Sequence, residues 1–102
     1  MKIMERRIIK VSSGKWAEIQ ELEKKWDALE DRIGGFPSKR RLRSVAGSED
    51  SNTFVWEREW ESFAACEAAY EKMMGNPEAQ TLGKESEPLN ESSRGEFYHF
   101  LP

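Results

Sequence analysis

The sequence predicts an α+β fold, because two segments pass from a strand directly into a helix. In Ile8–Trp26, a β-rich segment turns at Ser12–Gly14 and continues as an amphipathic helix. In Thr53–Met74, a strand runs into a second helix with almost no connector. The chain has 102 residues, of which 37% are hydrophobic and 34% charged, so we expect one folded domain over residues 1–102.

The first strand is predicted over Ile3–Val11, where β-branched residues precede a turn signal. The next helix is predicted to begin near Trp16 and to stop at Gly34, because glycine tolerates the left-handed conformation at a helix end. Pro37 prevents the helix from resuming. The apolar residues of this helix recur every three or four positions. They are expected to form one buried stripe, made of Trp16, Ile19, Leu22, Trp26, Leu29 and Ile33.

Two strands and a second helix are predicted in the middle of the chain. The strands cover Lys39–Ala46 and Thr53–Glu61, and the turn-rich loop Gly47–Asn52 joins them as a hairpin. The helix is predicted to begin after Ser62 as N-cap and to end at Gly75. The side chains expected to face the core are Phe63, Cys66, Tyr70 and Met73.

The C-terminal part is predicted to contain a short helix and a last strand. Asn76 as N-cap and proline at the first helical position predict a helix over Pro77–Lys84. Glu85–Arg94 is polar and is expected to be irregular, whereas Glu96–Leu101 has the composition of a strand. The element order βαββαβ is that of the ferredoxin-like fold, a four-stranded antiparallel sheet with two main helices on one face.

The other face of this sheet predicts a homodimer. Side chains alternate along a strand, so the aromatic residues of Glu96–Leu101 point to both sides of it. Along Thr53–Glu61, likewise, neither side is wholly apolar or wholly polar. A second sheet packed on the open face would cover these side chains, and its simplest source is another copy of the chain.

Several segments resemble a known family: GKWAE after the first strand, GG before the second, NTFVWEREWES running into a helix, and NPEAQ at the short helix. With the element order, they resemble the dimeric α/β-barrel superfamily and, within it, NIPSNAP-like domains. The resemblance implies a homodimer whose two sheets enclose a barrel. It implies no particular reaction, because the superfamily includes monooxygenases, haem-degrading enzymes, isomerases and members without assigned chemistry.

Composition and charge exclude several classes of function. The net charge of −3 argues against a nucleic-acid-binding protein, and no apolar run is long enough for a membrane span. The charged N-terminus MKIMERRIIK predicts a cytoplasmic protein. No Cys/His cluster indicates a metal site, and no cofactor is expected. Haem-degrading relatives combine Asn, Trp and His in their pocket, and the absence of a histidine in or just after either main helix argues against that activity.

The residues expected to line a ligand pocket are Trp56, Arg58, Glu57, Glu59 and His99. The two glutamates share one face of a strand, where close carboxylates can raise a pKa or bind a cation. Pairing with arginines is the favoured interpretation, and Arg6, Arg41 and Arg43 are the expected partners.

The only histidine and the only cysteine are each given a structural interpretation. His99 has the chemistry of a general acid/base, but its place between Tyr98 and Phe100 near the C-terminus favours a structural or solvent-edge role. Cys66 lies on the expected buried stripe of its helix, where a thiol behaves as a small hydrophobe.

Two functions remain open from the sequence. The first is a small cytosolic homodimer of unassigned biochemistry that binds a small apolar or aromatic ligand between sheet and helices. The second is a cofactor-independent enzyme of monooxygenase or isomerase type that uses the same cavity.

Overall fold

The computed structural model of the chain describes all 102 residues. In chain order its elements are β1 (Ile3–Val11), α1 (Trp16–Ile33), β2 (Arg40–Arg43), β3 (Thr53–Trp60), α2 (Phe63–Met74), α3 (Pro77–Ser86), the 3₁₀ turn η1 (Glu87–Leu89) and β4 (Asn90–His99). None of the helices combines the length and the apolar character that crossing a membrane requires.

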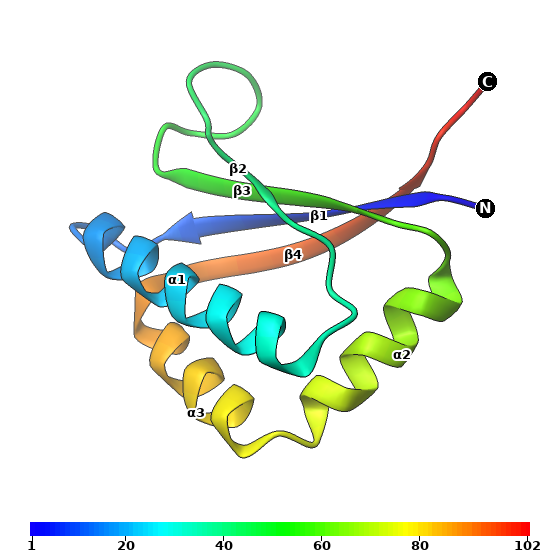
Figure 1. Cartoon of the computed structure of the whole chain (residues 1–102). Helices are drawn as coiled ribbons and strands as arrows, with labels where there is room; N and C mark the ends of the chain where they lie inside the picture. Colours follow the sequence, from blue (N-terminus) through cyan, green and yellow to red (C-terminus); the bar gives the residue numbers. More distant parts are fainter.

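The strands form one antiparallel sheet in the order β2-β3-β1-β4. All three α-helices lie on the same side of this sheet, and the other side is open (Figure 1). The predicted α+β fold of ferredoxin-like type is therefore confirmed. Strand β4 is an edge strand of ten residues, and only β1 pairs with it.

The helix boundaries follow the predicted capping signals. Helix α1 ends before Gly34, which has a positive φ of 83°. Helix α2 begins after Ser62, whose side chain accepts a hydrogen bond from the Ala65 amide at 3.1 Å. Helix α3 begins after Asn76, whose Oδ1 accepts from the amide of Glu78 at 2.8 Å. Side-chain oxygens thus satisfy amides that a helix start leaves without partners.

The strand boundaries differ from the prediction in two places. Strand β2 is shorter than Lys39–Ala46 and covers only Arg40–Arg43. Strand β4 begins at Asn90 and ends at His99, so the expectation that Glu85–Arg94 is irregular was wrong. Its first half is polar because it lies exposed at the sheet edge, and backbone pairing with β1 defines it instead of a hydrophobic pattern.

The core lies between the helices and the side of the sheet that they cover. On β1 this side carries the odd-numbered residues, and on β3 the even-numbered ones, since the two strands pair in that register. The predicted stripe of α1 is buried at Ile19, Leu22 and Leu29, and half-buried at its other positions. On α2, the buried residues are Cys66, Ala69 and Met73.

The predicted burial of Phe63 was wrong, because this side chain is 51% exposed. Phe63 is the first residue of α2, where the helix has only just left the sheet. Its ring lies beside Phe97 and His99 of the edge strand β4, with centroid separations of 5.4 and 6.1 Å. It therefore belongs to an exposed aromatic group at the sheet edge and not to the core.

Candidate functional site

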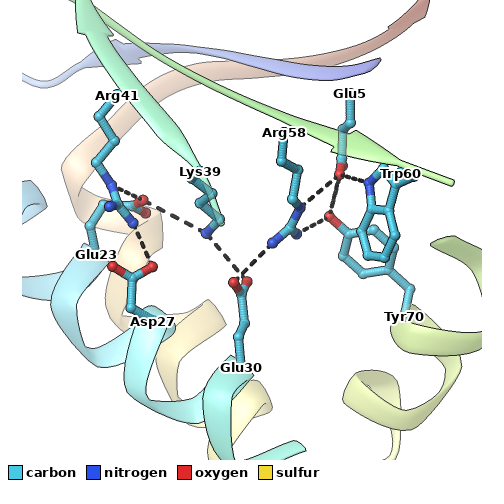
Figure 2. Close-up of polar contacts among 9 residues, drawn as sticks. All are labelled: Glu5, Glu23, Asp27, Glu30, Lys39, Arg41, Arg58, Trp60 and Tyr70. Atoms are coloured by element: carbon cyan, nitrogen blue, oxygen red, sulfur yellow. Dashed lines mark hydrogen bonds and ion pairs between the residues drawn. The ribbon is translucent and has the colours of Figure 1, made fainter. Parts of the chain in front are cut away.

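A chain of alternating charges runs between the sheet and helix α1 (Figure 2). Its charged side chains lie in contact with one another in the order Glu5, Arg58, Glu30, Lys39, Glu23, Arg41 and Asp27. Each cation lies between two carboxylates. Burying a charge is costly unless it is paired, and in this order every charged side chain has a neighbour of opposite charge.

Arg58 is the most deeply buried charge, with only 1% of its side chain exposed. Its Nε donates to Glu5 at 3.1 Å, its Nη1 to Glu30 at 2.9 Å, and its Nη2 to the Tyr70 hydroxyl at 2.5 Å. Burial alone would lower the pKa of Arg58, but Tyr70, Glu30 and Glu5 raise it above its ordinary value. The guanidinium therefore stays charged inside the core. Its Cζ also lies within 5.4 Å of the ring centroids of Phe36, Trp56, Trp60 and Tyr70.

At the end of this chain of charges that lies on the sheet, the Glu5 carboxylate accepts hydrogen bonds from three donors. Besides Arg58, its Oε1 accepts from the Trp60 indole at 2.9 Å, and its Oε2 from the Tyr70 hydroxyl at 2.7 Å. Burial raises the pKa of Tyr70, Arg58 opposes this shift, and the neighbouring Glu5 carboxylate adds to it. Tyr70 therefore keeps its proton, accepts from Arg58 and donates to Glu5.

Lys39 joins the two halves of the chain of charges. Its Nζ lies 3.3 Å from Glu30 and 3.8 Å from Glu23, and it sits 4.5 Å from the centroid of the Trp56 ring. Glu23 then pairs with Arg41 at 3.1 Å. All of these groups already have partners, so the arrangement forms a fixed polar wall.

A cavity of about 240 Å³ lies beside this wall, between the sheet and the helices. The sheet contributes Arg7, Trp56 and Arg58 to its lining, and α1 contributes Leu22 and Trp26. Tyr70 and Met73 of α2 close another side, and Ser86, Asn90 and Ser93 lie where α3 leads into β4. Seven of the fifteen lining residues are hydrophobic and the other eight are polar or charged, so the lining is more polar than that of most small-molecule sites.

The five residues predicted to share a pocket do not come together. Trp56 and Arg58 line the cavity, whereas Glu57 and Glu59 lie on the open face of the sheet because alternate side chains of β3 point to opposite sides. His99 is exposed near the end of β4 beside Phe63, and it does not line the cavity.

The prediction that arginines pair with the two open-face glutamates is correct for Arg6. Glu57 accepts from Arg6 Nε at 2.8 Å and also pairs with Arg40 at 3.2 Å. Arg40 pairs with Glu59 at 3.4 Å as well. The prediction was wrong for Arg41 and Arg43, because their positions in β2 point toward the helices.

The other two arginines of β2 have partners on the helix side of the sheet. Arg41 pairs with Glu23 and, at 2.6 Å, with Asp27. Arg43 donates to the Ser51 carbonyl oxygen at 2.8 Å, and its Cζ lies 4.0 Å from the centroid of the Trp16 ring.

Sequence reasoning missed most of the polar lining. Glu5 and Arg7 alternate with the apolar residues Ile3 and Ile9 on the covered side of β1, and this alternation was a usable signal. For Glu5, a charged residue in an apolar series predicts a buried partner, which is Arg58. For Asn90 no such signal existed, because its surroundings depend on where β4 begins.

Comparisons with known proteins support the fold. No family model matches the chain, and no curated protein is significantly similar to it in sequence. Among solved structures, a NIPSNAP family protein from Agrobacterium tumefaciens superposes with a TM-score of 0.80 at 20% identity, over 99% of this chain and 85% of that one. An uncharacterized NIPSNAP domain protein from Burkholderia xenovorans gives a TM-score of 0.80 at 17% identity, over 97% and 94% of the two chains.

A third similar structure has a described activity. SnoaB from Streptomyces nogalater, a cofactor-independent oxygenase, superposes with a TM-score of 0.73 at 17% identity, over 99% of this chain and 94% of SnoaB. The chain thus shares the fold of NIPSNAP family proteins, as the resemblance in its sequence implied. At these identities the likeness concerns the fold.

Proposed function

We propose that the protein is a cytosolic homodimer that binds a small apolar or aromatic ligand in the cavity between its sheet and its helices. The observation that carries this proposal is the cavity itself, whose volume is about 240 Å³. Sites for drug-sized ligands are typically about 300–1,000 Å³, so the ligand is a smaller molecule. Trp26 and Trp56 contribute aromatic surface to its lining. The cytosolic location follows the expectation from the sequence.

The homodimer is supported by the uncovered side of the sheet and by its edge strand. Large apolar side chains are exposed at the C-terminal end of β4 and just beyond it, namely Phe97, Tyr98, Phe100 and Leu101. The helices cover only one face (Figure 1), and Tyr98, which pairs with Met4 of β1, lies on the face that they leave open. Light scattering should therefore give about twice the chain mass of 11.8 kDa. A monomer at micromolar concentration would refute this part of the proposal.

A second candidate function is a cofactor-independent enzyme of monooxygenase or isomerase type. It is favoured by the superposition with SnoaB over nearly the whole chain. The binding function ranks first because the carboxylates that line the cavity, Glu23 and Glu30, are both held in ion pairs and no histidine lines it.

Ligand-observed NMR with a set of small aromatic compounds tests the binding function. Ser93 lines the cavity from β4, whereas the adjacent Ser92 points to the opposite side of the strand. Ser93→Phe should fill the cavity and abolish binding, and Ser92→Phe is the matched control that should retain it. Equal binding by both variants, or no binding by the wild type, would refute the proposal. Conversion of a bound compound to product would instead support the enzyme.

A further inference from the structure

We infer that the ligand of this cavity is a small aromatic monocarboxylate, with its carboxylate on the Arg7 guanidinium and a hydrogen-bond donor directed at Asn90. This inference rests on the proposed function, because it specifies the chemistry of the molecule that the cavity takes.

Arg7 is the one arginine of the chain that makes no hydrogen bond or ion pair. The other seven each have a carboxylate or a carbonyl partner: Arg6, Arg32, Arg40, Arg41, Arg43, Arg58 and Arg94. Arg7 nevertheless is not free in solvent, since it is half-buried and lines the cavity. A partly buried guanidinium with five unused donors is a site for an anion, and a carboxylate matches its fork with two parallel bonds.

The residue opposite Arg7 on the edge strand leaves space for this guanidinium. In the pairing of β1 with β4, Arg7 faces Gly95. A Cβ at Gly95 would lie 3.3 Å from Arg7 Cζ, which is closer than an ordinary contact. The guanidinium therefore rests against the bare backbone of β4, and a side chain there would press on it.

Asn90 supplies a second unused polar group in the same cavity. Its Oδ1 is buried without a hydrogen-bond partner, and no other buried side-chain nitrogen or oxygen lacks one. Such a group is unfavourable unless something donates to it. Asn90 pairs with Val11, four residues beyond Arg7 on β1, which is about 13 Å along a strand. An elongated molecule with an anion at one end and an N–H or O–H donor at the other would satisfy both groups.

The charges around the cavity favour one negative charge on the ligand. Of the cations that line it, Lys39 and Arg58 belong to the chain of ion pairs and are offset by its carboxylates. Arg7 has no carboxylate partner, so its charge is the one that a ligand would offset. A phosphate dianion would bring a second charge toward the lining carboxylates Glu23 and Glu30 without a cation to offset it. A monocarboxylate does not have this disadvantage.

Isothermal titration calorimetry with indole-3-acetate and indole-3-acetamide tests the inference. The two probes share an aromatic ring and an N–H donor, and they differ in charge. Arg7→Gln should weaken binding of the acid about 10- to 100-fold and change binding of the amide by less than about 3-fold, because a hydrogen bond to a charged group is worth more than a neutral one. Arg7→Lys should restore part of the affinity for the acid.

Two further variants separate the site from a general effect of charge. Lys72→Gln removes a cation from exposed helix surface and should leave both affinities unchanged. Asn90→Leu should weaken both probes about 5-fold, because both lose the acceptor for their N–H.

The outcomes distinguish this inference from the proposed function. If the acid and the amide bind equally well to the wild type, and Arg7→Gln changes neither, the inference is wrong and the cavity remains a site for neutral ligands. If neither indole probe binds while uncharged aromatic compounds do, the inference again fails alone. If no compound of either kind binds, the proposed function fails and the inference fails with it.

Discussion

The two faces of the sheet carry the same kind of ion pair in different surroundings. On the covered face, Arg58 and Glu5 are 1% and 2% exposed, whereas on the open face Arg6 and Glu57 are 34% and 14% exposed. Glu57 and Arg58 are neighbours in sequence, so strand alternation alone separates their environments. The contribution of an ion pair to stability therefore depends more on whether other elements cover that face of the strand than on which residues form the pair.

The largest expected effect is the loss of Arg58, compared with the loss of Arg6 as its matched control. Arg58→Met leaves Glu5 and Glu30 buried with one fewer cation, which should cost about 3–5 kcal/mol of the free energy of unfolding. Arg6→Met leaves Glu57 still paired with Arg40 and should cost less than about 1 kcal/mol. Urea denaturation followed by circular dichroism measures both. Equal costs would contradict the distinction between the two faces.

A second prediction uses pH to probe the covered side, where burial raises the pKa of the Cys66 thiol to about 11 from 9.0. Below pH 9 the Cys66 thiol keeps its proton in both the folded and the unfolded chain, so it does not change the free energy of unfolding. Between pH 9 and 11 the unfolded chain loses the proton first, so the free energy of unfolding falls as the pH rises. At pH 10.5 this loss should reach about 2 kcal/mol.

Cys66→Ala isolates the contribution of the thiol from that of other groups that titrate at high pH. Between pH 8 and pH 10.5 the variant should lose about 2 kcal/mol less stability than the wild type, measured by urea denaturation with a reducing agent present. Parallel pH profiles for the two proteins would show that the thiol titrates in the fold as it does in the unfolded chain.

The sequence predicted the elements whose local signals are strong. Ser62 and Asn76 cap their helices as expected, and Gly34 ends α1, because these effects act within one helical turn. The start of β4 was missed because a polar edge strand is defined by its partner and carries no apolar pattern. Local sequence therefore indicates element ends better than it indicates exposed edge strands.

The site was less predictable because it depends on which face the helices cover. Arg58 was recognised as a pocket residue, but Glu57 and Glu59 were grouped with it although strand alternation separates them. Glu30 and Lys39 lie close together only after α1 packs on the sheet. Contacts of this kind depend on tertiary packing, and no local pattern in the chain contains them.

The smallest expected effect concerns Phe63, with Met73 on the same helix as the comparison. Phe63 is 51% exposed and contacts the edge strand through Phe97, so Phe63→Ala should cost less than about 1 kcal/mol of the free energy of unfolding. Met73 is buried in the core, and Met73→Ala should cost about 2–5 kcal/mol.

Measuring both variants at low and high protein concentration sharpens the test, because a partner chain stabilises the fold in a concentration-dependent way. A cost above about 2 kcal/mol for Phe63→Ala that appears only at high concentration would mean that a second chain covers this edge of the sheet. The same cost at every concentration would mean that the chain itself buries Phe63, contrary to the exposed position described above.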